Sequence, residues 1–156
     1  MGLQQTLLSE PISSLPLAPG VMVPGETLVR EAVAKMRETR QGCVVVVDDQ
    51  GKPRGKFTEH HIPKLLANEP GFMNNPVSNY MRDSWACLRR GDPIATVIHK
   101  LQTYRQRFVV IVDDDGRAVG VTEQKGIMVY LSEQYAHLVK VQQMAGKLAI
   151  ETREGA

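Results

Sequence analysis

The chain of 156 residues lacks the features by which metal-binding, disulfide-linked and membrane proteins are commonly recognised. Its only two cysteines, Cys43 and Cys87, belong to no CxxC or Cys/His cluster, so neither a zinc site nor a disulfide framework is expected. Apolar runs such as Val44–Val47 are far too short to cross a bilayer. No charged and apolar leader segment opens the chain, which favours a cytoplasmic location over secretion or a membrane.

A large excess of one charge is also absent. Nineteen Lys and Arg residues stand against 17 Asp and Glu, and the formal net charge of +2 is too small to predict a DNA-binding surface. The sequence has no GxGxxG loop, P-loop or nucleophile triad, so we predict that the protein is not an enzyme. The pair His60–His61 has no evident third ligand, and we therefore predict no metal site. Hydrophobic residues make up 42% of the chain, enough for the core of one domain or two small ones.

The sequence contains an internal repeat. A shift of 65 residues places Pro11–Ser13 on Pro76–Ser78 and Val44–Gly51 on Val109–Gly116, with no gap from residue 11 to residue 55. We then infer the loss of one residue from the second copy, so that the Thr-Glu pair at 58–59 meets the pair at 122–123. A repeat of this length indicates a duplicated supersecondary unit and two pseudosymmetric halves.

Each copy predicts the same order of elements. Apolar residues at i, i+3, i+4 and i+7 mark an amphipathic helix. These residues are Val29, Ala32, Val33 and Met36 in the first copy, and Ile94, Val97, Ile98 and Leu101 in the second. The β-branched run that follows is typical of a buried strand, and Asp-x-x-Gly after it predicts a tight turn. With a short strand before the helix, around Val21–Val23 and Ala86–Leu88, and a second strand and helix after the turn, each copy becomes a β-α-β-β-α unit. We expect an α/β (α+β) fold with repeats at 11–67 and 76–132.

The chain continues beyond the second copy. From about Glu123 to Ile150 apolar residues recur every three or four positions, which predicts one long helix with an extension at 133–150. The apolar seam consists of Leu131, Tyr135, Leu138, Val141, Ala145 and Leu148. We expect this seam to pack on the protein's own surface, and an intermolecular coiled coil is the alternative.

The order of motifs resembles that of a known family. Pro-Val-Ser-x-x-Met, a short strand, an amphipathic helix, a Val-rich strand, Asp-x-x-Gly and Gly-x-x-Thr-Glu follow one another. Over about residues 11–132 the chain resembles a tandem pair of cystathionine-β-synthase-type (CBS) domains, an arrangement called a Bateman module. The resemblance implies a disc-like homodimer whose clefts between repeats bind AMP, ADP or ATP, or S-adenosylmethionine. It further implies a regulatory, non-catalytic role toward another protein.

The same resemblance implies which residues contact the ligand. In the family, a Ser or Thr ends the third strand at a helix start, where free backbone N–H groups favour anions. Main chain of the first strand and of the lead-in to the second strand surrounds the base, and basic side chains near that lead-in approach the phosphates. Carried over by position, the first pocket draws on Met22, Val23, Arg40, Cys43, Thr58 and His61. The second draws on Cys87, Leu88, Arg105, Arg107, Phe108, Thr122 and Lys125.

This sequence departs from the family pattern at the ribose site. The family usually has an Asp three residues after the Ser or Thr, but His61 and Lys125 stand there. Lysine has no acceptor for a ribose hydroxyl, whereas a neutral histidine could accept one hydrogen bond. Because Pro63 is costly beyond the first turn of a helix, we expect the helix after Thr58 to begin near His61 or Ile62, which makes the first pocket the weaker candidate.

The basic residues leave two interpretations open. Lys125 with Arg105 and Arg107 favours a polyanion such as ATP or a cyclic dinucleotide over S-adenosylmethionine, unless Lys125 is simply exposed on a solvated helix end. Arg40 and Arg105, which coincide between the copies, could contact phosphates, but we favour a role in capping the preceding helix.

We therefore expect a regulatory module that senses an adenine nucleotide, mostly through the second pocket, and that dimerises through the helices flanking the clefts. The alternative is a ligand-free dimerisation or protein-interaction module, which the loss of Asp from both copies supports. No further cofactor is expected.

Overall fold

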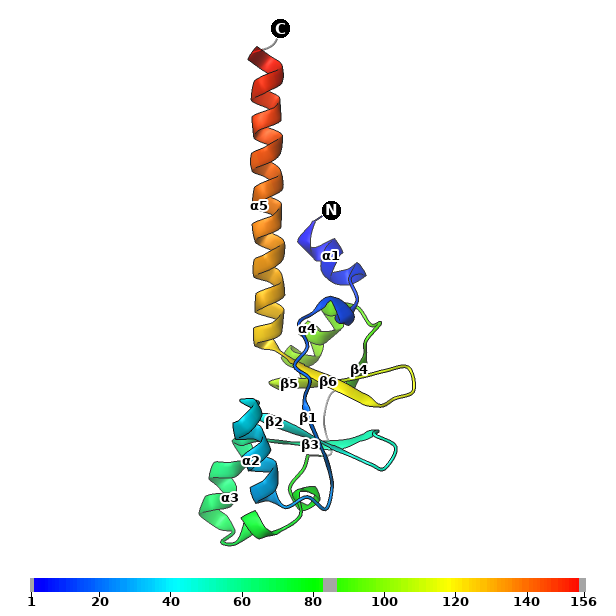
Figure 1. Ribbon diagram of the computed structural model, residues 1–156, viewed down its shortest axis with the longest axis vertical. Helices are drawn as coiled ribbons and strands as arrows, with labels where there is room; N and C mark the ends of the chain where they lie inside the picture. Colours follow the sequence, from blue (N-terminus) through cyan, green and yellow to red (C-terminus); the bar gives the residue numbers. More distant parts are fainter. Residues whose placement is uncertain (1, 83–86, 155–156) are drawn as a thin grey trace.

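Each half of the chain forms a three-stranded sheet (Figure 1) in the computed structural model, which describes residues 2–82 and 87–154. The first sheet has the order β1 (Val21–Pro24), β2 (Cys43–Val47), β3 (Pro53–Thr58), and the second β4 (Cys87–Arg89), β5 (Phe108–Val112), β6 (Ala118–Glu123). In both, the first pair is parallel and the second antiparallel. The predicted α+β fold with two like repeats is confirmed, and Ala86, predicted to begin a strand, lies outside the described residues.

The two amphipathic helices form as predicted. α2 (Val29–Thr39) and α4 (Ile94–Thr103) connect the parallel strands, and their apolar stripes are buried in the core of each repeat. After each helix an arginine takes the left-handed conformation, with φ of 54° at Arg40 and 47° at Arg105. After α2, the Gln41 N–H donates to the Met36 carbonyl at 3.0 Å, so the main chain closes this helix end.

The Asp-x-x-Gly sequences form the expected turns. The Asp48 carboxylate accepts hydrogen bonds from the N–H groups of Gln50 and Lys52, and Asp113 is bonded in the same way in the second repeat. Gly51 and Gly116 take φ of 77° and 80°, which glycine adopts at no steric cost. The aspartates of these solvated turns therefore stabilise the two β-hairpins.

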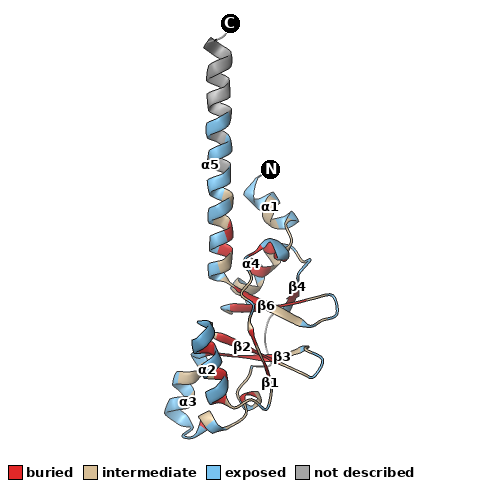
Figure 2. Cartoon of the chain, viewed as in Figure 1, coloured by how far each residue is buried: buried red, intermediate tan, exposed pale blue. Residues whose placement is uncertain are grey.

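The two repeats exchange short segments. Ile12 and Leu15, which precede the first sheet, are buried in the core of the second repeat. Val77, which precedes the second sheet, is fully buried in the core of the first. Between the sheets a third cluster contains Val45, Val110 and Val121. Figure 2 shows the buried residues concentrated on the strands and on the helix faces that cover them.

Strand register corrects the predicted alignment of the repeats. Val44 pairs with Phe57 and Val109 with Thr122, while Cys43 pairs with Thr58 and Phe108 with Glu123. Glu123 therefore takes the place of Thr58, and the inferred loss of one residue is wrong. The shift of 65 also relates Ile62 to Ile127, which pack into the cores of their own repeats.

The two repeats differ in the segments that follow β3 and β6. After β3 a 3₁₀ turn (Glu59–His61) precedes α3 (Ile62–Asn68), with Pro63 in the first turn, as predicted. After β6, α5 (Gln124–Glu154) begins at once. The N-terminal α1 (Leu3–Ser9) precedes the repeats.

α5 leaves the body of the molecule (Figure 1). Ile127 and Tyr130 in its first turns are buried, but Tyr135 is 71% exposed and Val141 49%. The prediction that the seam packs on the protein's own surface is wrong at Tyr135 and Val141, whereas Leu131, at the start of the seam, does pack against the core of the second repeat. The side chains of Leu138, Ala145 and Leu148 lie outside the described set. No described helix combines the length and apolar content needed to cross a membrane.

Candidate ligand-binding clefts between the repeats

Two pseudosymmetric cavities lie where the end of one sheet meets the helix-to-strand connection of the other repeat. Cleft A, of about 270 Å³, is lined by Lys56, Thr58, His60, His61, Arg82, Arg105, Gln106, Arg107 and Phe108. Cleft B, of about 200 Å³, is lined by Ala18, Arg40, Gln41, Gly42, Glu59, Arg107, Phe108, Val121 and Glu123.

The structure groups the predicted residues differently from the sequence. Thr58 and His61 of the first repeat lie in cleft A with Arg105, Arg107 and Phe108 of the second. Arg40, from the first set, lies in cleft B. The reason is that the sheets face one another, so the end of β3 lies beside the start of β5. Each cleft is therefore built from both repeats.

Several predicted residues line neither cleft. Val23 and Leu88 belong to the cores of their own repeats, and Met22 packs against the cluster between the sheets. Cys43 is fully buried, and burial raises the pKa of its thiol to about 12, which suits a packed thiol. Cys87 and Lys125 are exposed.

Thr122 also lies away from both clefts. Its side chain is 1% exposed and stands at the Phe57 position, on the opposite face of the strand from Val121 and Glu123. A shift of one residue along a strand reverses the face of every side chain, and this shift separates Thr122 from Thr58.

His61 offers a hydrogen-bond donor where the family has an acceptor. The Thr58 N–H donates to His61 Nδ1 at 2.9 Å, and the ring stacks on Phe57 with centroids 5.1 Å apart. Burial, followed by the charge of Arg82, lowers the pKa of His61 below its usual 6.5, so the ring is neutral at pH 7. The proton of the neutral ring therefore lies on Nε2, which is buried and has no partner among the described residues. The expectation that His61 could accept a ribose hydroxyl is wrong, because its accepting nitrogen is already used.

Lys56 is the functional candidate that the sequence analysis missed. It is 4% exposed, and its Nζ donates to the Phe108 carbonyl at 2.6 Å and to Gln106 Oε1 at 2.8 Å. Burial lowers the pKa of its ammonium. Comparing Gly-Lys-Phe-Thr at Gly55 with Gly-Val at Gly120 would have shown a charge at a position that the second repeat keeps apolar.

Arg107 lies between the two clefts and lines both. Its guanidinium forms an ion pair with Glu59 at 3.1 Å and lies 2.7 Å from His60 Nε2. These contacts join the second repeat to the turn that follows β3. Together with the Lys56 hydrogen bonds, they tie the repeats together around cleft A.

The two clefts differ in charge. Lys56, Arg82, Arg105 and Arg107 line cleft A, and no carboxylate is among its described lining residues. Cleft B is mixed, because Glu59 and Glu123 accompany Arg40 and Arg107. Cleft A is therefore suited to an anion. No described group of three or more His, Cys, Asp or Glu residues is arranged to hold a metal ion.

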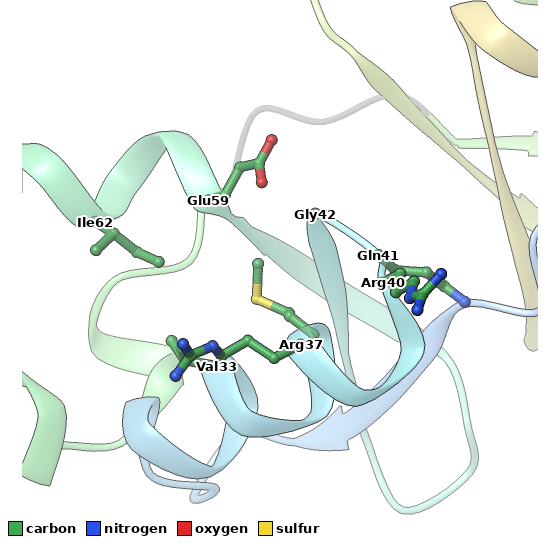
Figure 3. Close-up of a pocket in the computed structure, with 8 residues that line it drawn as sticks. Val33, Arg37, Arg40, Gln41, Gly42, Glu59 and Ile62 are labelled. Atoms are coloured by element: carbon green, nitrogen blue, oxygen red, sulfur yellow. The ribbon is translucent and has the colours of Figure 1, made fainter.

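Each repeat also carries a groove between its two helices. The α2–α3 groove, of about 410 Å³, has Val33 and Arg37 on one wall and Glu59 and Ile62 on the other (Figure 3). The α4–α5 groove, of about 300 Å³, has no charged residue in its described lining, which includes Ile98, Leu101, Ile127, Met128 and Leu131.

Comparison with known proteins defines the class of this fold. The family model of the CBS domain matches residues 12–68 and 77–133, more than half of the chain. The chain therefore belongs to the CBS domain family and carries two CBS domains in tandem, as in a Bateman module. No curated protein sequence matches the chain significantly.

Solved structures show the same fold. A CBS domain protein from Pyrobaculum aerophilum, solved with AMP, has 23% identity and a TM-score of 0.69, with coverage of 75% of this chain and 89% of its own. The CBS domain pair of protein MJ0100, solved with 5′-methylthioadenosine and S-adenosyl-L-methionine, has 21% identity and a TM-score of 0.71, with coverage of 80% and 98%. An uncharacterized conserved protein from Pyrococcus horikoshii has 24% identity and a TM-score of 0.69, with coverage of 79% and 92%.

Proposed function

We propose that the protein is a non-catalytic regulatory module that senses a phosphorylated adenosine ligand, such as AMP, ADP or ATP, in cleft A. The observation that carries this proposal is the set of four cationic side chains in cleft A with no carboxylate among the described lining residues. CBS domain pairs are in general regulatory modules, and two similar structures were solved with adenosine ligands. A cationic cleft disfavours S-adenosylmethionine, whose sulfonium is positive.

The residue roles follow from the geometry of cleft A. Arg82 and Arg105 supply charge to the phosphate, and His61 Nε2 and the Thr58 hydroxyl supply hydrogen bonds. Lys125 has no direct role in this proposal, because it is exposed and outside both clefts.

Occupancy of cleft A would act on the rest of the molecule through β5. Phe108 lines both clefts and pairs with Glu123, the residue before α5. A ligand that moves Phe108 therefore moves the base of α5, and through it a regulated protein.

Isothermal titration calorimetry with AMP, ATP, S-adenosylmethionine and a cyclic dinucleotide tests the ligand class. Arg105→Gln should weaken ATP binding by about 10- to 100-fold, which is the effect of losing one charged hydrogen bond. Arg40→Gln is the matched control, because it occupies the equivalent left-handed position but lines cleft B. Lys125→Ala should bind as the wild type does. Equal losses in the two arginine variants, or no binding of any nucleotide by the wild type, would overturn the proposal.

We also propose a second function, dimerisation through α5, because its exposed apolar residues continue the α4–α5 groove. Beyond the buried Ile127, spacings of three and four residues alternate as in the a/d pattern of a coiled coil, at Leu131, Gln134, Leu138, Val141, Ala145 and Leu148. Glu133, Lys140 and Lys147 recur seven residues apart, outside that seam. A second copy of this chain is the partner that presents the same repeat over the same length.

Gln134 favours a parallel arrangement. In a parallel, in-register coiled coil Gln134, which occupies one of these a/d positions in place of the Tyr135 of the predicted seam, lies opposite its own copy, where the two amides can hydrogen-bond. Sedimentation velocity should therefore show a dimer that Val141→Glu dissociates and Gln143→Glu, the same charge outside the seam, does not. A monomeric wild type would exclude this function.

A further inference from the structure

Lys56 is a buried cation whose described surroundings supply no counter-ion. Its ammonium has two acceptors, the Phe108 carbonyl and Gln106 Oε1, and both are uncharged. No carboxylate among the described residues forms a salt bridge with it, and Arg82 adds a repulsive positive charge. Transferring a charged group from water to such a site is costly unless an opposite charge accompanies it.

The cleft geometry says where an opposite charge can enter. Lys56 lines cleft A, and an ammonium has three N–H donors, of which two are used by its protein acceptors. An oxyanion in the cleft can accept the third. It would meet Arg82 and Arg105 in the same cavity.

Cleft B has no buried ammonium among its described lining residues, although it is built from the equivalent positions of the two repeats. Val121 occupies the place of Lys56, because Val45 pairs with Lys56 and Val110 with Val121. Gln41 takes the place of Gln106, and its Oε1 is buried with no partner among the described residues, whereas Gln106 Oε1 accepts from Lys56. Glu59 and Glu123 add negative charge to cleft B. A phosphate there would meet two guanidinium groups and two carboxylates, and no buried ammonium.

We propose that Lys56 makes the two clefts unequal, so that each chain binds one phosphorylated ligand, in cleft A, with the Lys56 ammonium as the counter-ion of its phosphate. The proposal rests on the proposed function of cleft A and assigns the group that distinguishes a nucleotide from a nucleoside. Because Lys56 belongs to β3 and its two acceptors to the second repeat, the bound anion also strengthens the tie between the repeats.

The test is calorimetry on the full chain with ATP, AMP, adenosine and inorganic pyrophosphate as separate probes. We expect one ATP per chain in the wild type. Lys56→Met should weaken the binding of ATP and AMP by about 10- to 100-fold, since the charged contact to the phosphate is lost. The affinity for adenosine should stay within about twofold of the wild-type value. Val121→Met, the same side chain at the equivalent position of cleft B, is the matched control and should bind ATP as the wild type does. Lys56→Gln, which can still donate to the Phe108 carbonyl, gives a second variant should Lys56→Met fail to fold.

The outcomes separate the two proposals. Two ATP molecules per chain, or ATP binding unchanged in both Lys56 variants, would overturn the role of Lys56 and leave the proposed function standing. Pyrophosphate binding that depends on Lys56, without binding of any adenosine compound, would overturn the adenosine ligand and leave the anion site standing. Failure of every probe to bind the wild type would overturn both.

Discussion

At the scale of the residue, Gly120 and Gly55 allow the two repeats to be joined. A Cβ on Gly120 would lie 2.6 Å from the Ala18 carbonyl oxygen, and one on Gly55 would lie 3.0 Å from the Arg82 carbonyl oxygen. The chain segments leading into the two repeats thus run against strands of the opposite sheet, as the Ala18–Val121 and Lys56–Arg82 bridges show. Both contacts are made to backbone, which cannot rotate away.

We predict that Gly120→Ala lowers the free energy of unfolding by about 1–3 kcal/mol, the usual effect of overpacking a closed site. Gly91→Ala is the control, because a Cβ there has nothing within 4 Å. It should change stability by no more than about 0.5 kcal/mol. Urea denaturation followed by circular dichroism gives both values, and equal stability of the two variants would contradict the close approach.

At the scale of the element, α5 differs from the other helices because most of its length has no described contact with the body. About 23 residues follow Leu131, a length of about 35 Å at the usual helical rise. In proteins most of the stability of a helix comes from the packing of its apolar face, so a partner helix is the expected source of stability for this segment.

Cysteine cross-linking tests the parallel arrangement of α5. In a Cys87→Ser background, Val141→Cys should form an intermolecular disulfide under mild oxidation, because residues at one seam position meet across a parallel pair. Gln143→Cys, on the outer side, should not. Cys43 does not interfere, because it is fully buried and burial raises the pKa of its thiol to about 12. A disulfide at Gln143→Cys but not at Val141→Cys would contradict this seam.

At the scale of the whole molecule, the exchange of Ile12 and Val77 makes each core depend on the other half of the sequence. Ile12 is fully buried in the core of the second repeat, and Val77 in that of the first. The folding units therefore do not coincide with the sequence repeats, and neither repeat carries a complete core without the other.

We predict that Ile12→Ala destabilises the protein by about 2–5 kcal/mol, as for other buried large-to-small changes. Hydrogen exchange should show the loss of protection mainly in β4–β6. Val77→Ala, the reciprocal variant, should lose protection mainly in β1–β3. If each variant instead weakened the sheet of its own sequence repeat, the exchange of segments would be disproved.

The turns and helices could be predicted from the sequence because each depends on a short local pattern of residues. The Asp-x-x-Gly turns, the apolar stripe that begins at Val29 and the helix start near Ile62 each depend on residues within a few positions of one another. The duplication could be recognised from the identical and similar residues of the two copies. These features came out as expected because turn chemistry and helical periodicity act over such short distances.

The site could be predicted only in part. The roles suggested for Thr58 and Thr122 assumed that these two threonines occupy equivalent positions in the two repeats. The strand pairing shows instead that Glu123, which lies opposite Phe108, is the equivalent of Thr58. The charge of Lys56 was visible in the sequence, but its position facing the other repeat was not.

The amino-acid sequence by itself determined the two copies, their turns, their helices and the family to which the chain belongs. Only the tertiary structure decided which side chains share a cleft, because one residue of register reverses the face of a strand and because the exchanged segments set the end of β3 beside the start of β5. These contacts between residues far apart in the sequence depend on how the two halves pack together, and a local sequence pattern does not predict that packing.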